Sequence, residues 1–150
     1  MTRLEKQGLI TFACILIVLA FVGLFWHQLI WKSANISHYR FHLTVSCFCT
    51  FTLGGPFPTI EVEDGKIVSM TDEKGSAITK EYEYYGTFSR YGTIDRLFST
   101  LHSFSVLKAD EVTVKYDPAY GFPSEIHIQY NKSFADDGIG LYVSGFEVLP

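Results

Sequence analysis

The spacing of hydrophobic residues changes along this chain, and each spacing is typical of a different structure. Residues 8–26 are almost continuously apolar, residues 38–50 alternate between apolar and polar side chains, and residues 94–104 carry an apolar side chain at every third or fourth position. A long apolar run is typical of a membrane span, alternation of a half-buried strand, and the longer repeat of an amphipathic helix. The pattern therefore predicts a membrane segment followed by a domain of strands and a helix.

The apolar run from Gly8 to Trp26 is long enough to cross a bilayer. As a helix it spans about 28 Å, close to a hydrocarbon thickness of roughly 30 Å. Residues 29–31 extend it, and both tryptophans of the chain, Trp26 and Trp31, lie at the same end. Because amphipathic indole rings favour the membrane–water boundary, these two side chains are expected to mark one surface of the membrane.

The charges that flank the apolar run predict its orientation. Arg3 and Lys6 precede the run, whereas only Lys32 follows it closely. The positive-inside rule then places the N-terminus in the cytoplasm and the later residues outside a cell membrane that the chain crosses once. A cleaved signal peptide or a lipoprotein signal at Cys14 fits less well, because the apolar run continues past either cleavage site. The expected division is a cytoplasmic N-terminus at residues 1–7, an anchor at 8–31, a linker at 32–37 and an extracytoplasmic domain at 38–150.

Alternating side chains predict several β-strands in the outer domain. Asp64-Gly65 lies between two alternating runs and is the strongest short-range signal for a hairpin. A two-residue turn there pairs Glu63 with Lys66, which is an exposed charge match. The apolar phase of the first strand consists of Tyr39, Phe41, Leu43, Val45, Cys47 and Cys49. Shorter alternating runs predict further strands near residues 79–84, 112–116, 126–130 and 141–146.

One amphipathic helix is predicted between these strands. Thr93 stands where an N-cap is expected, and Asp95 lies in the first turn, where the helix dipole favours a negative charge. The apolar stripe of this helix is Ile94, Leu97, Phe98, Leu101 and Phe104. Since one helix cannot connect many parallel strands, the expected fold is α+β, with an antiparallel sheet of about six strands and the helix packed on one face.

Cys47 and Cys49 are the sharpest chemical feature of the sequence. They are expected to form a disulfide outside the cytoplasm, to be buried thiols, or to act as a redox pair. Residues two apart on a flat strand are separated by about 6.6 Å, whereas disulfides prefer about 5.5–6 Å, so a bond requires a bulge or a pinched strand end. A zinc site with His38 and His42 is disfavoured, because the histidines lie in the opposite phase of the strand.

Two turns carry candidate binding residues. The first is a rigid turn that also suits a recognition loop, since loop aromatic side chains often anchor partners; its residues are Tyr116, Asp117, Tyr120 and Phe122. The second holds Asp136 and Asp137, which fit a cation or acid–base pair weakly. A solvated turn is favoured for this pair, because adjacent side chains on an extended chain point apart.

Composition and motifs narrow the classes of function. The net charge of −4 argues against nucleic-acid binding, which needs a basic face. The sequence holds no HExxH, G-x-S-x-G or P-loop motif. We therefore predict no catalytic, cofactor-binding or metal-ligating residue, which favours a non-catalytic role and leaves enzymatic activity open.

The motifs of the outer domain, taken in order, resemble one family. They are Tyr39-x-Phe41-x-Leu43, Cys47-Phe48-Cys49, the Asp64-Gly65 hairpin, Thr93-Ile94-Asp95-Arg96-Leu97-Phe98, Tyr116-Asp117-Pro118-x-Tyr120-Gly121-Phe122-Pro123 and Ala135-Asp136-Asp137. Over nearly all of residues 38–147 this set resembles the bacterial domain-of-unknown-function family 6174. The resemblance implies a secreted or membrane-attached domain and no known activity.

Two hypotheses for function follow. The first is a non-catalytic, membrane-anchored module that binds a protein or envelope component outside the cell, with an exposed aromatic patch near Tyr120 and Phe122. The second is a thiol-disulfide or metal-handling protein that uses Cys47 and Cys49, and it requires at least one accessible sulfur.

Overall fold

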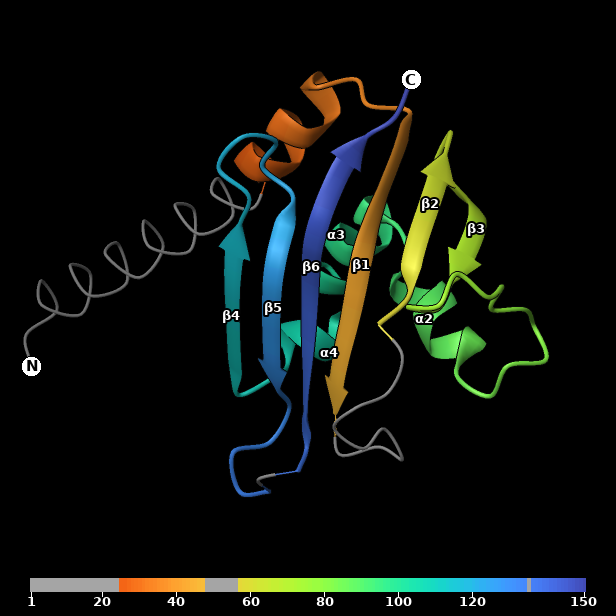
Figure 1. Ribbon diagram of the computed structural model, residues 1–150. Helices are drawn as coiled ribbons and strands as arrows, with labels where there is room; N and C mark the ends of the chain where they lie inside the picture. The colour runs from red at the N-terminus through yellow and green to blue at the C-terminus, as the bar shows by residue number, and fades with distance from the viewer. Residues whose placement is uncertain (1–24, 48–56, 135) are drawn as a thin grey trace, which may run out of the picture.

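One antiparallel sheet with helices on a single face makes up the domain (Figure 1). The structure is a computed structural model that describes residues 25–47, 57–134 and 136–150. The strands are β1 (His38–Cys47), β2 (Thr59–Glu63), β3 (Lys66–Thr71), β4 (Glu111–Tyr116), β5 (Pro123–Gln129) and β6 (Gly138–Val148), and the helices are α2 (Tyr85–Tyr91), α3 (Ile94–Leu101) and α4 (Phe104–Leu107). Residues 25–33 form a further helix. The expected α+β class is confirmed.

The sheet order is β3-β2-β1-β6-β5-β4, so the strand nearest the N-terminus lies in the middle. β1 pairs with both β2 and β6, and its alternation separates the two faces of the sheet. The inward phase is buried and consists of Tyr39, Phe41, Leu43 and Val45. These side chains meet the buried stripe of α3, which is Ile94, Leu97, Phe98 and Leu101.

The β2–β3 hairpin has the predicted register. Glu63 pairs with Lys66 across a turn in which Asp64 has φ 49° and Gly65 has φ 73°. Positive φ at both central residues is the type I′ geometry, whose twist matches that of the flanking strands. The local sequence therefore determines this hairpin.

A hydrogen bond from α3 fastens this helix to β1. Thr93 caps α3, and its Oγ1 accepts a hydrogen bond from the backbone N–H of Arg96 at 3.1 Å. The backbone N–H of Ile94 donates to the hydroxyl of Tyr39 at 3.1 Å. Burial raises the pKa of Tyr39 to about 12, so this hydroxyl stays neutral at ordinary pH.

The prediction of a strand at residues 79–84 is wrong. These residues form turns, and α2 follows them and buries Phe88. Tyr82 and Tyr84 are spaced as they would be on one face of a strand, and this led to the wrong prediction. In the structure both lie in a turn, with their rings edge to face and the ring centroids 5.8 Å apart. The helix-covered face therefore carries more than the single helix that was expected.

Helix 25–33 packs on the domain through Trp31. This side chain is 5% exposed and lies edge to face against Tyr39, Phe122 and Phe146, with ring centroids 5.4, 6.0 and 5.9 Å away. The expectation that Trp31 marks a membrane boundary is therefore wrong, because its indole belongs to the domain core. The expected linker at residues 32–37 likewise begins inside this helix.

Most of the expected anchor, residues 8–24, lies outside the described residues. Within the part of the chain that the structure describes, no helix is both long and apolar enough to cross a membrane.

Candidate functional site

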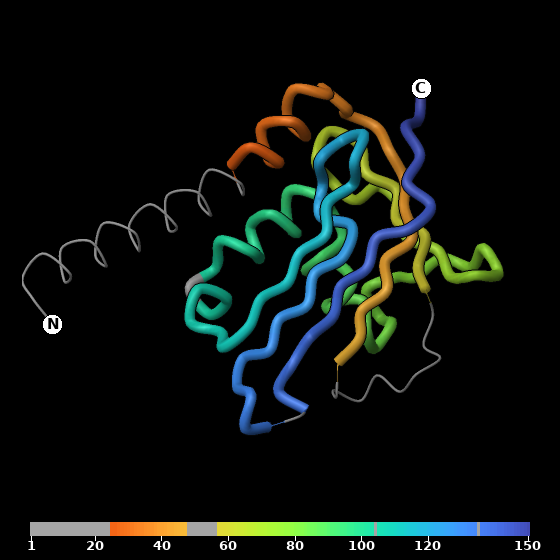
Figure 2. The backbone as a smooth tube through the Cα atoms, turned by 90° about the vertical axis from the view of Figure 1, so that its left-hand side faces the viewer, coloured from red at the N-terminus to blue at the C-terminus, as the bar shows by residue number. Residues whose placement is uncertain are grey.

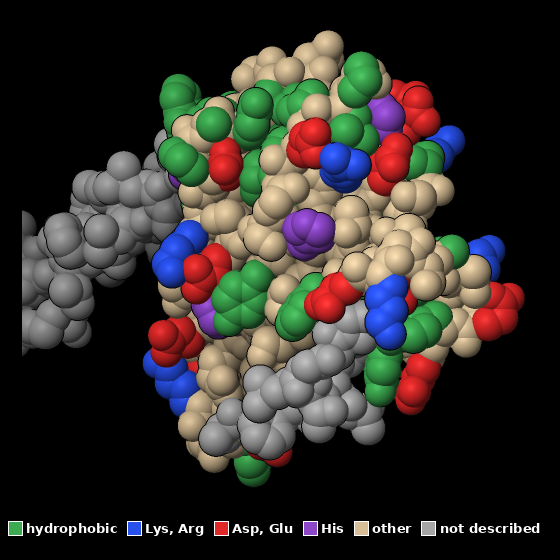
Figure 3. All heavy atoms as spheres, viewed as in Figure 1, with side chains coloured by type: hydrophobic (Ala, Val, Ile, Leu, Met, Phe, Trp, Pro, Cys, Tyr) green, Lys and Arg blue, Asp and Glu red, His purple; other side chains and the backbone are tan. Residues whose placement is uncertain are grey.

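The face of the sheet that points away from the helices is polar, and we call it the open face. No described helix covers it (Figure 1). Figure 3 looks onto this face: a histidine lies near its centre, surrounded mostly by backbone and side chains that are neither charged nor hydrophobic, and acidic and basic side chains lie around it. Strand register places these residues on it: His38, Arg40, His42, Thr44 and Ser46 of β1; Thr59 and Glu61 of β2; Tyr142 and Ser144 of β6; Glu125 and His127 of β5; and Thr113 and Lys115 of β4.

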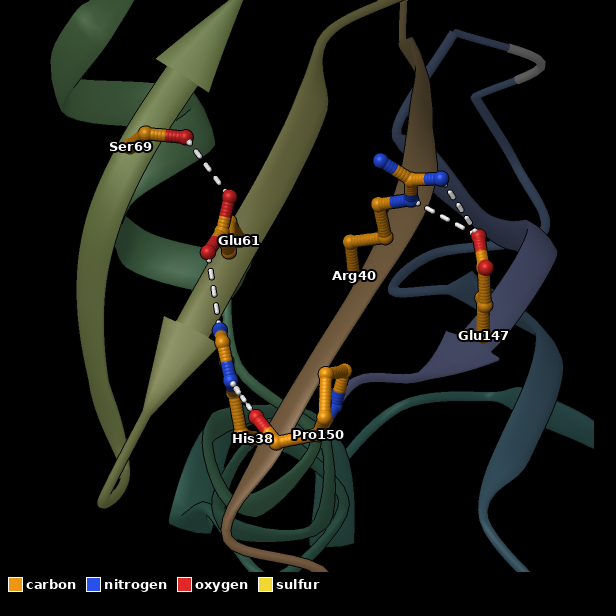
Figure 4. Close-up of polar contacts among 6 residues, drawn as sticks. All are labelled: His38, Arg40, Glu61, Ser69, Glu147 and Pro150. Atoms are coloured by element: carbon orange, nitrogen blue, oxygen red, sulfur yellow. Dashed lines mark hydrogen bonds and ion pairs between the residues drawn. The ribbon is translucent and has the colours of Figure 1, made fainter.

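His38 makes two hydrogen bonds at one end of the open face (Figure 4). Its Nε2 lies 2.8 Å from Oε1 of Glu61, and its Nδ1 lies 2.8 Å from the backbone oxygen of Pro150. A carboxylate and a carbonyl both accept, so only the doubly protonated imidazolium satisfies both bonds. The hydrogen bond to Glu61 and then that to Pro150 raise the pKa of His38.

Two further contacts complete this row of side chains. The hydroxyl of Ser69 donates to Oε2 of Glu61 at 3.5 Å. On the other side of β1, Nε of Arg40 donates a hydrogen bond to Oε2 of Glu147 at 2.8 Å (Figure 4). Nη2 of Arg40 lies 2.7 Å from the same oxygen. The row therefore links four strands by polar side chains alone.

A second polar cluster surrounds Glu125 on β5. Lys115 donates to one carboxylate oxygen at 2.6 Å, and His127 Nε2 lies 2.8 Å from the other. The hydrogen bonds from Lys115 and then His127 hold the pKa of Glu125 below its usual range. The His127 ring also lies edge to face on Tyr142, with the centroids 5.2 Å apart.

His42 lies between these two clusters, and a β-bulge positions it. The β1–β6 register shifts between Arg40 and His42, and Gly145 on the bulged strand has φ +58°. A Cβ at Gly145 would lie 2.5 Å from Cδ2 of His42, so only glycine lets the ring lie against the backbone here. The other side of the ring is fixed by Thr59, whose Oγ1 lies 3.0 Å from Nδ1.

The polar side chains of the open face are spread over its surface. The histidines and carboxylates of the open face are held by neighbouring side chains, most of them on other strands, and they form separate clusters. Within the described residues, no group of three or more His, Cys, Asp and Glu side chains could hold a metal ion. Fixed donors and acceptors at a surface can make directional hydrogen bonds to a partner.

Cys47 is the last residue of β1, and it packs against the edge of the core. It is not a free thiol in the structure. Cys49 lies outside the described residues, so its pairing with Cys47 stays a prediction.

The predicted recognition loop holds helix 25–33. His27 stacks on Tyr116 with ring centroids 3.7 Å apart and planes 1° apart. The side chain of Ile30 lies where a Cβ on Gly121 would stand, 2.9 Å away. Phe122 is 2% exposed and contacts Trp31. The expectation of an exposed anchor at Phe122 is therefore wrong, because helix 25–33 covers it.

The remaining residues of this loop shape the turn. The carboxylate of Asp117 accepts from the backbone N–H groups of Ala119 and Tyr120 at 2.9 and 2.8 Å. Tyr120 is half-buried against Phe146, with ring centroids 5.5 Å apart. Both side chains therefore fix the loop conformation that receives the helix.

Asp136 and Asp137 lie in an exposed turn before β6. The backbone oxygen of Asp137 accepts from the N–H of Tyr130 at 2.9 Å, which closes the turn. This contact uses the backbone of Asp137, not its carboxylate.

Reasoning from the sequence missed the polar clusters of the open face. It treated the histidines singly, although Glu61, the partner of His38, lies 23 residues away on another strand, and Glu125, the partner of His127, lies two residues away on the same strand. The signal that could have found these clusters is the set of polar residues at alternate positions of each strand. Strand register places these residues side by side in rows.

Comparison with known proteins gives one match. The model of a family of unknown function, DUF6174, matches residues 26–148. The matched region includes most of helix 25–33, in agreement with the packing of Trp31 in the core. No curated protein and no solved structure matches the chain. Because the match covers most of its length, the chain belongs to the DUF6174 family of unknown function.

Proposed function

We propose that this protein is a membrane-anchored extracytoplasmic domain that binds a protein or envelope component through its open face. The observation that carries the anchor is the two-sided character of helix 25–33. One side, with His27, Ile30 and Trp31, packs on the domain. The other side leaves apolar side chains exposed.

The exposed side of helix 25–33 suits a lipid surface. Phe25, Trp26 and Leu29 are 54%, 62% and 60% exposed. Three large apolar side chains on one short helix are a costly surface in water, but they fit the membrane interface. In the sequence, this helix comes directly after the apolar residues 8–24. These features support an anchor that holds the domain close to the bilayer.

The position of the helix supports an orientation for the domain. Trp31 contacts Tyr39 and Phe122, which belong to the helix-covered side of the sheet. An anchor that leaves from this side directs the open face away from the bilayer. Its histidines and ion pairs are then presented to the surrounding compartment.

The two tryptophans offer a direct test of the anchor. Trp31→Phe leaves only Trp26 as a fluorophore, and Trp26→Phe leaves only Trp31. The full chain of each variant is placed in vesicles with or without lipids brominated in their acyl chains. We expect brominated lipid to quench Trp26 and not Trp31, since Trp26 faces lipid and Trp31 lies inside the protein. Quenching of Trp26 by aqueous iodide, with no effect of brominated lipid, would overturn the anchor.

The topology is tested by labelling intact cells. Lys132→Cys and Thr2→Cys place thiols on either side of the expected anchor, and the unsubstituted chain gives the background of the native cysteines. We expect a membrane-impermeant maleimide to label position 132 and not position 2. The reverse pattern would place the domain in the cytoplasm.

Binding through the open face is tested with two serines. A photo-crosslinking amino acid replaces Ser144 on the open face or Ser99 on α3, both of which are exposed. We expect discrete adducts in intact cells from position 144 only. Equal adducts from both positions, or none from position 144, would contradict a binding role for this face.

We also propose that Cys47 pairs with Cys49 in a structural disulfide. The support is that Cys47 is not a free thiol. The proposed location outside the cytoplasm is one in which disulfides persist. Differential alkylation of acid-trapped cells, read by mass spectrometry, should find both sulfurs oxidised to each other. Two free thiols would exclude this pairing, whereas reduction at the potential of a cellular thiol pool would favour the redox hypothesis.

A further inference from the structure

The two edges of the sheet differ in how far their backbone groups are paired. At the β3 edge, Thr71 bridges to Ala77, and the N–H of Ile78 donates to the oxygen of Met70 at 2.8 Å. At the other edge, β4 pairs with β5 alone among the described strands. Figure 2 looks directly onto this edge. Alternate residues of an edge strand direct their N–H and C=O groups outward, so β4 offers a template for another strand.

From this we infer that β4 pairs with β4 of a second copy of the chain, antiparallel and about a two-fold axis at Thr113. The result is one continuous sheet of two domains. The strand sequence Glu-Val-Thr-Val-Lys-Tyr contains no proline that would block pairing, and its valines, threonine and tyrosine favour strands.

The side chains of β4 select the register at Thr113. Residues directly opposite each other must lie on the same face, so the two-fold axis passes through a residue and not between two. Centring on Val114 would oppose Glu111 to the partner's Asp117, and centring on Val112 would oppose an aspartate to a valine. Centring on Thr113 avoids both conflicts.

In this register the open face gains a row of alternating charges. Lys115 lies opposite the partner's Glu111, and Glu111 lies opposite the partner's Lys115. Within one chain, Lys115 already bonds Glu125 at 2.6 Å, and Glu111 bonds Lys132 at 3.0 Å. Each row therefore reads Glu125, Lys115, the partner's Glu111 and the partner's Lys132, with a sign change at every step. Opposite charges across a strand pair stabilise it.

The helix-covered side of the same edge is apolar. Val112 lies opposite the partner's Val114 in this register. Val112 is 39% exposed in the single chain, and Leu107 of the neighbouring α4 is 64% exposed. Strand pairing would cover the valine and bring apolar surface toward the leucine, which favours association.

The symmetry agrees with two anchors in one membrane, a point that rests on the proposed function. A two-fold axis perpendicular to the sheet keeps both helix-covered sides on the same side of the extended sheet. Both copies of helix 25–33 then approach the bilayer together, and both open faces point away from it.

Cysteine cross-linking tests the register. Directly opposite residues of an antiparallel pair have Cα atoms about 4.5–5.5 Å apart, within reach of a disulfide. Thr113→Cys should therefore give a covalent dimer of the full chain under mild oxidation, in membranes or detergent. Ser69→Cys is the matched control, because Ser69 is an exposed residue on β3, the other edge strand. The unsubstituted chain shows the background from native cysteines.

A charge exchange tests the same contact without cysteine. Lys115→Glu alone and Glu111→Lys alone should each weaken dimer formation about tenfold, because like charges then oppose each other twice. The double variant restores opposite charges between the two copies and should dimerise more strongly than either single variant. Full recovery is not expected, because positions 115 and 111 then carry the same charge as their intrachain neighbours Glu125 and Lys132. Sedimentation in detergent measures the association, and circular dichroism confirms that each variant is folded.

The outcomes separate the possibilities. A covalent dimer at Thr113→Cys and recovery in the double variant support the paired sheet. A monomer at all concentrations, equal cross-linking at Ser69→Cys, or no recovery in the double variant would overturn it. None of these results depends on whether Trp26 faces lipid, so they test the paired sheet independently of the membrane anchor.

Discussion

Neighbouring residues of β1 show how differently the two faces of the sheet are built. Phe41 is fully buried under α3, whereas His42, the next residue, is exposed on the open face. On the covered side, apolar packing supplies the stability. On the open side, hydrogen bonds and ion pairs between strands arrange polar groups at the surface.

This difference separates the side chains that stabilise the fold from those that are exposed on the open face. Burial of large apolar side chains dominates the folding free energy, while exposed ion pairs contribute little to it. Residues of the open face can therefore change without loss of the fold. A protein that binds through one side of a sheet benefits from this separation, because its binding face is free to vary.

The largest expected effect comes from truncating the covered side. Phe41→Ala should lower the free energy of unfolding by about 3–5 kcal/mol, because it removes a buried ring and leaves a cavity. His42→Ala, one residue along the same strand, should cost less than about 1 kcal/mol. Urea unfolding followed by circular dichroism measures both. Similar losses for the two variants would break the comparison between the faces.

The next effect concerns the contact between the loop and helix 25–33. Gly121→Ala should destabilise the protein by about 1–3 kcal/mol and expose Trp31 to iodide, because its Cβ meets Ile30 at 2.9 Å. Gly75→Ala is the matched control, since Gly75 has φ +79° beside φ +73° for Gly121 but no atom within 4 Å of the added Cβ. Both variants carry the same backbone strain. Equal effects would show that the helix contact adds nothing.

A smaller effect should follow loss of the hydroxyl that joins α3 to β1. Tyr39→Phe leaves the buried N–H of Ile94 without its acceptor and should cost about 1–2 kcal/mol. Tyr120→Phe is the control, because its hydroxyl makes no hydrogen bond among the described residues and its ring stays against Phe146. If both variants unfold at the same urea concentration, the hydroxyl of Tyr39 does not fasten the helix.

The smallest effect concerns the open face and depends on pH. Glu61 raises the pKa of His38 above its ordinary value of 6.5. A group whose pKa is higher in the folded state stabilises the fold at pH values below its unfolded-state pKa. This stabilisation is lost as the pH rises through its folded-state pKa. The urea midpoint of the unsubstituted chain should therefore be higher than that of His38→Gln at pH 5.5, and the two midpoints should approach each other at pH 8.5.

NMR titration of His38 gives the accompanying control. Glu61→Gln replaces the charged acceptor by a neutral one, so the pKa of His38 should fall toward 6.5. An unchanged pKa in this variant would show that Glu61 does not hold the imidazolium.

Local patterns predicted the parts of the fold that are held by local forces. The Asp64-Gly65 turn, the Thr93 cap and the inward phase of β1 all appear where the sequence placed them. The turn at residues 79–84 was missed because two alternating tyrosines in a turn look like a short strand. The polar clusters were missed because Glu61 and Glu147 reach His38 and Arg40 only through strand register, and Lys115 reaches Glu125 in the same way.

The sequence by itself determined the alternation that separates the two faces, the hairpin and the amphipathic stripe of α3. These depend on backbone geometry and side-chain period within a few residues. Only the tertiary structure decided that Trp31 belongs to the core and that the Tyr116–Phe122 loop holds a helix. In the sequence an indole after an apolar run suits lipid and protein equally well. The difference lies in Tyr39, Phe122 and Phe146, which reach Trp31 only after the chain has folded.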